Sequence, residues 1–102
     1  MDGLAVNPKF PLGQLFVTPG AHDRAQFLEL DLGSFLKRHH SGDWGDLDPE
    51  DRQLNNRAIR DGSRILSAYK VGEDGEKIWI ITDAEVMEGV RLTTTILLPE
   101  EY

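Results

Sequence analysis

The 102-residue sequence contains no cysteine. Disulfides and thiolate metal sites are therefore excluded, and a reducing cytoplasm is the expected compartment. No apolar run approaches the roughly 20 residues that a membrane-spanning helix needs. Residues 1–13 also lack the basic start and apolar stretch of a secretion signal. We therefore expect a soluble cytoplasmic protein with no membrane partner.

The sequence also has few basic residues. It contains 11 lysines and arginines and 18 aspartates and glutamates, which gives a formal net charge of −7. A protein that binds nucleic acid with its whole surface normally carries a basic patch that displaces counterions from phosphates. Nucleic acid therefore remains a candidate only through a local cationic cleft, near residues 37–40 and 52–64. The acidic excess favours a protein partner with a basic surface, or serves only solubility.

The length leaves room for one domain with a modest core, since 39% of the residues are hydrophobic. Residues 1–13 contain two glycines and two prolines without a sustained hydrophobic period. This pattern is typical of an irregular N-terminal arm. We expect residues 14–102 to form the single domain.

Three helices are indicated in the N-terminal half. Thr18 followed by Pro19 resembles an N-cap and a first helical residue. Apolar residues recur at helical spacing in residues 32–40, which end in a run of positive charge. Asp48 begins a further helix with acidic residues in its first turn, and Gly62 ends it.

The C-terminal half has the period of strands. A glycine-containing turn separates Arg64–Val71 from the β-branched and aromatic run Lys77–Thr82, which predicts a hairpin. After an acidic connection, Arg91–Leu98 is a third strand, and Gln14–Val17 is a short candidate edge strand. The pattern predicts an α+β fold in which N-terminal helices pack on a three- to four-stranded antiparallel meander sheet.

The densest group of chemically active side chains lies in residues 38–45, between two predicted helices. His39 and His40 are adjacent, so on a helix they point about 100° apart, and a metal pair from both is disfavoured. We predict no metal site and no cofactor. His39 at a helix end is either a cation that caps the helix or a general acid or base near neutral pH.

A set of catalytic candidates follows if His39 faces the sheet. Arg64, Ser67, Tyr69 and Thr94 supply a cation and hydroxyl groups for a phosphodiester. A metal-independent ribonuclease needs a base for the 2′-hydroxyl, an acid for the leaving oxygen and a cation for the phosphorane. The alternative is structural, because threonine is a good strand former and tyrosine packs well in a core.

A second set points to partner binding. Trp44 is either a plug at the helix junction or an exposed anchor for a partner, since tryptophan is frequent at binding hot spots. Three carboxylates surround it in the sequence, those of Asp43, Asp46 and Asp48. These four residues are the candidate contacts for a basic partner.

Short motifs over most of the chain carry a family resemblance. They are Thr18–Ala21, Arg38–His39, Gly42–Leu47, Asp51, Asn56, Gly62 with Arg64, Leu66–Tyr69, Ile78–Thr82 and Thr94–Tyr102. In these motifs the chain resembles a family of small plasmid-related proteins from bacterial mobile elements. The resemblance implies a mobile-element setting and no particular activity. The chain departs from the family pattern at residues 83–91, where the connection is longer.

A weaker similarity concerns the order of elements. Helices bearing a histidine precede an antiparallel sheet with late hydroxyl residues, as in nucleases of the barnase, EndoU, colicin and RelE type. Two hypotheses result: a binding protein that engages a host or nucleic-acid-handling complex, including one of host defence, and, as the alternative, a metal-independent ribonuclease. Regulation of conjugation or transcription is less specific, because no helix shows a basic recognition face. The oligomeric state is left open.

Overall fold

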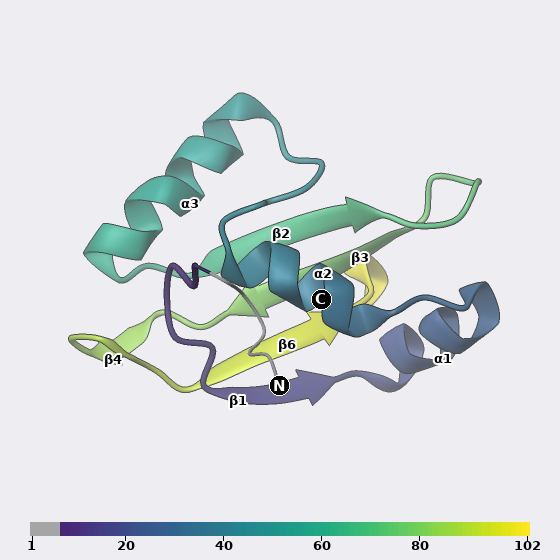
Figure 1. Ribbon diagram of the computed structural model, residues 1–102, viewed down its shortest axis with the longest axis horizontal. Helices are drawn as coiled ribbons and strands as arrows, with labels where there is room; N and C mark the ends of the chain where they lie inside the picture. Colours follow the sequence, from purple (N-terminus) through teal and green to yellow (C-terminus); the bar gives the residue numbers. More distant parts are fainter. Residues whose placement is uncertain (1–6) are drawn as a thin grey trace.

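The computed structural model describes residues 7–102, in which three helices precede most of the strands (Figure 1). The helices are α1 (Pro19–Leu28), α2 (Leu32–His40) and α3 (Pro49–Asp61). The strands are β1 (Gln14–Val17), β2 (Ile65–Lys70), β3 (Lys77–Thr82), β4 (Glu85–Met87), β5 (Val90–Arg91) and β6 (Thr93–Leu97), and a 3₁₀ turn, η1, spans Pro99–Glu101. The predicted α+β class is confirmed.

Side-chain caps begin all three helices, and two of these caps are visible in the sequence. The side chains of Thr18 and Asp48 accept backbone N–H groups three residues ahead, at 3.1 and 2.9 Å. Such caps satisfy donors that the first helical turn leaves without partners. Asp31, which was not predicted as an N-cap, caps α2 in a similar way. Gly62 ends α3 with a φ of 83°, a left-handed conformation that glycine adopts without strain.

The main sheet has the strand order β1-β6-β3-β2, and β4 pairs with β5 in a separate small ladder. β2, β3 and β6 are antiparallel neighbours, as predicted, but β1 runs parallel to β6. The sheet is therefore mixed, and the prediction of a wholly antiparallel meander is wrong for β1. A tight hairpin forces the antiparallel direction only on β2 and β3, whereas a connection that contains helices permits a parallel pair.

The predicted third strand is divided into β5 and β6, and the acidic connection before it contains β4. Arg91, the last residue of β5, is only 3% exposed. The guanidinium donates to three backbone carbonyls at 2.7–3.0 Å, those of Ala58, Ser63 and Asp83. It therefore ties β5 to the end of α3, away from the ladder of β6.

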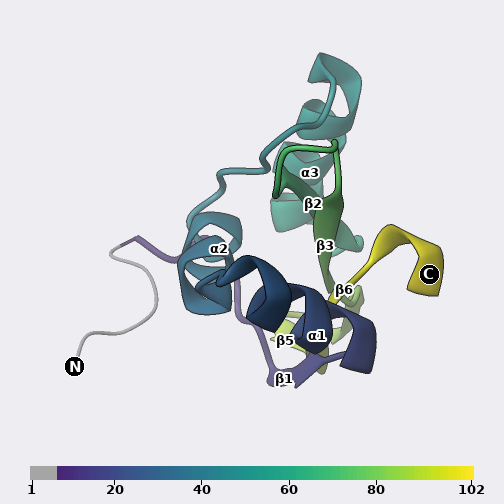
Figure 2. The ribbon, with the colours of Figure 1, turned by 90° about the vertical axis from the view of Figure 1, so that its right-hand side faces the viewer.

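One face of the main sheet is covered by α2, and the C-terminal turn lies on the opposite side (Figure 2). The strand residues on the α2 face contribute five members of the core, namely Ile65, Tyr69, Ile78, Ile80 and Ile96. Phe10 and Leu12 join them from the predicted N-terminal arm, with 6% and 7% exposure. Residues 7–13 form no helix or strand but still fill the core; residues 1–6 of that predicted arm lie outside the described residues.

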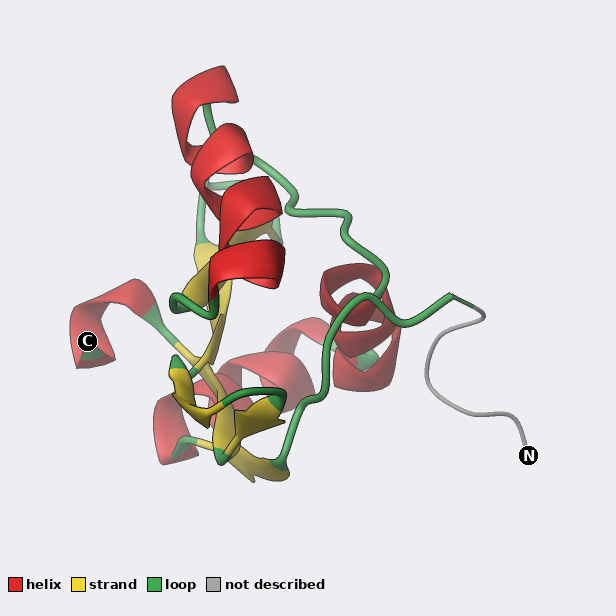
Figure 3. Ribbon diagram, turned by 90° about the vertical axis from the view of Figure 1, so that its left-hand side faces the viewer, coloured by secondary structure: helices red, strands yellow, loops and turns green. Residues whose placement is uncertain are grey.

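The two edges of the main sheet have different surroundings. α3 lies beside β2, and the loop that leads into α3 from α2 passes around this edge (Figure 3). β1 forms the other edge, at the bottom of Figure 1. Among residues 7–102, the β2 edge is enclosed by other segments and the β1 edge is not.

Candidate functional site

His39 lies fully buried at the centre of a chain of hydrogen bonds that crosses the sheet. Its Nδ1 is 2.6 Å from Ser67 Oγ, and its Nε2 is 2.9 Å from Thr82 Oγ1. Thr82 Oγ1 lies 2.7 Å from Thr94 Oγ1, whose hydroxyl donates to the carbonyl of Leu12 at 2.7 Å. The chain therefore joins α2, three strands and the segment before β1.

The carbonyl at the end of this chain determines the direction of its hydrogen bonds as far as His39 Nε2. A carbonyl only accepts and a hydroxyl carries one proton, so Thr94 donates to Leu12 and must accept from Thr82. Thr82 then accepts from His39 Nε2–H, and because burial keeps the ring neutral, Nδ1 is the acceptor for Ser67. We infer a neutral His39 with its proton on Nε2, and each member of the chain is satisfied.

Burial keeps this histidine neutral. It lowers the pKa of His39 to about 3, and the neighbouring His40 adds a smaller effect in the same direction. A general base needs a ring nitrogen within reach of its substrate and a pKa near the working pH. His39 meets neither condition, and since it is uncharged at neutral pH it is not a cationic helix cap either.

The other catalytic candidates do not meet in an open cleft. Ser67 and Thr94 share the buried chain of His39, and Tyr69 is 1% exposed on the same face of the sheet. The Tyr69 hydroxyl donates to the carbonyl of Asp43 at 2.6 Å, and burial raises the pKa of Tyr69. Arg64 is exposed instead, with its guanidinium 5.4 Å from the centre of the Tyr102 ring.

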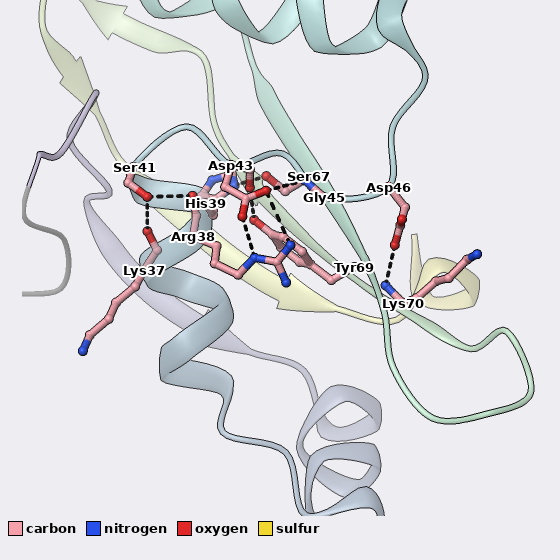
Figure 4. A network of polar contacts seen from close by, with 10 residues as sticks. All are labelled: Lys37, Arg38, His39, Ser41, Asp43, Gly45, Asp46, Ser67, Tyr69 and Lys70. Carbon is pink, nitrogen blue, oxygen red and sulfur yellow. Dashed lines mark hydrogen bonds and ion pairs between the residues drawn. The ribbon is translucent and has the colours of Figure 1, made fainter.

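Asp43 organises the loop after α2 (Figure 4). Its Oδ2 accepts from Arg38 Nε at 2.7 Å, and its Oδ1 accepts from the backbone N–H of Gly45 at 3.1 Å. The hydrogen bond from Arg38 lowers the pKa of Asp43. The Arg38 guanidinium also lies 4.6 Å from the ring centre of Tyr69. Asp43, a predicted partner contact, therefore already has a structural role in holding Arg38 and the loop.

Trp44 is a core residue with 5% exposure. Its indole N–H donates to Asn56 Oδ1 at 3.0 Å, and its ring packs near Phe10 and His39. Of the two interpretations of Trp44, the plug at the helix junction describes the structure. The exposed-anchor interpretation is wrong, because the apolar indole area is removed from water and no partner can reach it.

Asp46 and Asp48 border a groove on the face of the sheet that α2 does not cover. It consists of two adjoining hollows of about 500 and 230 Å³, which share Leu47, Asp51 and Leu66. The larger hollow is also lined by Asp46, Asp48, Ala68, Lys77 and Trp79, and the smaller one by Leu54, Asn55 and Arg64. We call this feature the α3 groove.

The α3 groove has an apolar floor and an acidic rim. Trp79 and the small Ala68 contribute the floor from paired positions of β3 and β2. Asp46 and Asp48 each accept one backbone N–H, from Lys70 at 3.0 Å (Figure 4) and from Asp51 at 2.9 Å. Within residues 7–102 the side chain of Asp51 accepts no hydrogen bond. The rim therefore presents three carboxylates beside a partly exposed tryptophan.

Trp79 is the functional candidate that the sequence reading missed. It alternates with the fully buried Ile78 and Ile80, so the strand period already assigned it to the opposite face. What the period could not reveal is that α2 covers only one face. On the other face Trp79 keeps partial exposure and packs edge-to-face with Tyr102, with 5.6 Å between the ring centres.

Two further features of residues 7–102 bear on the kind of site. No group of three or more histidine, aspartate or glutamate side chains in this range is arranged to hold a metal ion. No helix in the same range has the length and apolar character to cross a membrane.

Comparison of the chain with models of protein families, with curated proteins and with solved structures finds no match. Function is therefore inferred from the geometry of the chain itself.

Proposed function

We propose that this chain is a small binding protein that holds a basic segment of a protein partner in the α3 groove. The observation that supports this most directly is the rim of Asp46, Asp48 and Asp51 beside the apolar floor at Trp79. A carboxylate rim attracts lysine and arginine and repels acidic competitors. The floor adds a site for one apolar side chain, and tryptophan is frequent among residues that dominate binding energy.

The size and charge of the groove suit a short segment better than a broad surface. A hollow of about 500 Å³ lies in the range of sites that enclose small ligands or single large side chains. Arg64 and Lys77 line the smaller and the larger hollow respectively, so the groove is not uniformly acidic. We therefore expect a partner segment whose basic residues flank an apolar one and meet the three carboxylates.

The wider role is part of the same proposal. In the mobile-element setting that the family resemblance implies, the partner would be a host or nucleic-acid-handling complex, including one of host defence. Such proteins carry basic surfaces for phosphates, and carboxylates can occupy those surfaces in place of nucleic acid. The net charge of −7 supports this choice of partner.

The test uses Trp79 as the reporter. In a Trp44→Phe background Trp79 is the single tryptophan, and we expect its emission to change when a peptide with lysines flanking a leucine is added. A peptide with glutamates in place of the lysines should leave the emission unchanged. Affinity for the basic peptide should fall as salt is raised, because salt screens exposed charges.

Charge-removing variants locate the binding site. Asparagine at positions 46, 48 and 51 removes three charges but keeps an oxygen that accepts the backbone N–H groups. We expect the triple variant to bind the basic peptide about tenfold more weakly or worse. The control removes three exposed charges elsewhere, by Glu73→Gln, Asp74→Asn and Glu88→Gln. Equal weakening in both triple variants would mean that net charge, and not the groove, attracts the peptide.

The ribonuclease alternative stays a prediction without geometric support in residues 7–102. His39, Ser67 and Thr94 lie within the core, and Arg64 stands beside Tyr102 on the other face. RNA cleavage that survives a chelator and disappears in a folded His39→Gln variant would revive it.

A further inference from the structure

β1 is an edge strand whose outer side has no partner in residues 7–102. The N–H groups of Gln14 and Thr18 donate inward, to the carbonyls of Leu92 and Ile96 at 2.9 and 3.0 Å. Backbone groups of successive strand residues point in opposite directions. The N–H and C=O groups of Leu15 and Val17 therefore point away from β6, and no hydrogen bond to them occurs in the described part of the chain.

The side chains of this edge are apolar and exposed. Leu15, Phe16 and Val17 are each 45% exposed, and the neighbouring Leu92 is 55% exposed. Natural proteins usually protect such an edge with a charge, a proline, a bulge or a covering segment. The strand Gln14–Val17 contains no charge and no proline, although the chain as a whole has a net charge of −7.

We infer that β1 is a self-association edge, at which a second copy of this chain adds its own β1 in the antiparallel direction. With the two-fold axis at Phe16, Leu15 of each copy lies opposite Val17 of the other. The outward groups of these residues then form four backbone hydrogen bonds, because donors face acceptors on both sides. The two Phe16 side chains meet at the axis, in a pair type that stabilises neighbouring strands.

A second copy fits this edge better than the basic partner of the α3 groove does. A strand that pairs with itself about a two-fold axis is self-complementary by symmetry. The strand Gln14–Val17 has no carboxylate to attract a basic segment, and it places no like charges directly opposite one another when two copies pair. The four main strands of each copy would form one continuous eight-stranded sheet.

The size of the contact determines how strong the association is. Pairing of two four-residue strands and their neighbouring side chains buries much less surface than the roughly 1,200 to 2,000 Å² that stable interfaces bury. We therefore expect a reversible dimer with a micromolar or weaker Kd. Both copies carry a net charge of −7, so added salt should strengthen the dimer by screening their repulsion.

Sedimentation equilibrium tests this inference. The protein concentration should run from about 1 µM to about 1 mM, because a dimer with a micromolar or weaker Kd forms over that range. The mean mass of the wild-type protein should rise from one chain toward two, and should rise at lower protein concentration when salt is added. The α3 groove behaves in the opposite way, since its basic ligand binds less tightly in salt. A failure of the dimer and a failure of the groove are thus distinguishable. A wild-type protein that remains monomeric throughout overturns the inference.

Phe16→Lys and Phe16→Glu identify the edge. Each variant places like charges opposite one another at the axis, so each should be monomeric alone, whereas an equimolar mixture should form a heterodimer. The matched control is Phe27→Lys, which makes the same change at a phenylalanine 85% exposed on α1 and should dimerise like the wild type. Dimers of the Phe16 variants, or a monomeric Phe27→Lys protein, would assign the association to another surface.

Amide hydrogen exchange needs no variant and covers the case in which a Phe16 substitution disturbs β1. The amides of Leu15 and Val17 should exchange rapidly at low protein concentration and become protected as the dimer forms. The amide of Gln14, which already donates to Leu92, should change little. Protection of Leu15 and Val17 that does not depend on protein concentration would contradict pairing with a second copy.

Discussion

The two edges of the main sheet differ in how their backbone groups are satisfied. At the β2 edge, Asn55 of α3 binds both backbone groups of Leu66, donating to the C=O at 2.7 Å and accepting from the N–H at 3.2 Å. The loop of residues 44–46 binds both groups of Ala68, at 3.2 and 2.6 Å. The N–H of Lys70 donates to the carboxylate of that loop at 3.0 Å. At the β1 edge, nothing in residues 7–102 does the same.

The difference shows that the β2 edge is closed by backbone groups and side chains together. The backbone of residues 44–46 satisfies Ala68, and side chains satisfy Leu66 and Lys70. A buried or half-buried backbone group without a partner is costly, so an enclosed edge needs a donor or acceptor opposite each such group. Asn55 and Asp46 provide the side-chain groups for β2. Within residues 7–102 no hydrogen bond reaches the outward backbone groups of β1, so these groups are available for pairing.

The largest expected effect concerns the chain of hydrogen bonds that runs from β2 through His39 to the segment before β1. His39→Ala removes two buried hydrogen bonds and leaves a void, and we expect it to lower the free energy of unfolding by about 3 to 5 kcal/mol. The control is His40→Ala, at the adjacent and less buried residue, with a loss below about 1.5 kcal/mol. Urea unfolding at pH 7 measures both. Equal losses would mean that the chain of hydrogen bonds contributes little.

Opening the β2 edge should have the next largest effect. Asn55→Ala leaves the N–H and C=O of Leu66 unpaired, and we expect a loss of about 2 to 4 kcal/mol in the free energy of unfolding. Gln53→Ala, on the exposed side of the same helix, should change it by less than about 0.5 kcal/mol. If the two variants are equally stable, the β2 edge is no better closed than the β1 edge.

Acid should lower the free energy of unfolding by a smaller amount, through protonation of His39. His39 has a pKa of about 3 in the folded protein, against 6.5 ordinarily, so the unfolded chain binds the extra proton between these values. Stability is therefore complete above pH 6.5 and falls as the pH drops toward 3. Between pH 7 and pH 5 we expect a loss of about 2 kcal/mol.

The control for this pH dependence is His39→Gln, which cannot titrate. It retains His40, whose pKa burial also lowers, so the difference between wild type and variant isolates His39. The hydrogen bond from Arg38 lowers the pKa of Asp43 below its usual 3.8. The contribution of Asp43 to the free energy of unfolding is therefore retained between pH 7 and pH 5 and is lost only as the pH falls further. Parallel pH profiles for wild type and variant would contradict a neutral buried imidazole.

The smallest effect requires no change in stability. At low protein concentration, the amides of Leu66, Ala68 and Lys70 should exchange slowly, and those of Leu15 and Val17 should exchange near the rate of an unfolded chain. Hydrogen exchange followed by NMR measures both edges in one sample. Equal protection at the two edges at low concentration would remove the distinction between them.

Much of the local structure could be predicted from the sequence because its signals act over a few residues. Thr18 and Asp48 cap their helices through contacts three residues away, and Gly62 ends α3 by its own conformation. The hairpin of β2 and β3 follows from two apolar runs around a turn. The direction of β1 and the division into β5 and β6 could not be predicted, because both depend on contacts between distant segments.

The candidate site was less accessible from the sequence. His39, Ser67 and Thr94 do come together, but in the core, since residue types do not reveal which cluster water can reach. The two tryptophans illustrate this. Trp44, rich in polar neighbours along the chain, is buried, whereas Trp79, within an apolar run, lines the α3 groove.

The α+β class, the caps at Thr18 and Asp48, the hairpin and the acidic charge follow from the sequence alone, because capping, periodicity and composition are local properties. The face that α2 covers, the carboxylates that border the groove and the edge that lacks a partner in residues 7–102 depend on how the elements pack together. Burial and hydrogen-bond partners depend on segments that are far apart in the sequence, such as Leu12 and Thr94, which are 82 residues apart. A short sequence pattern cannot predict such a contact, because the two segments meet only after the sheet has formed.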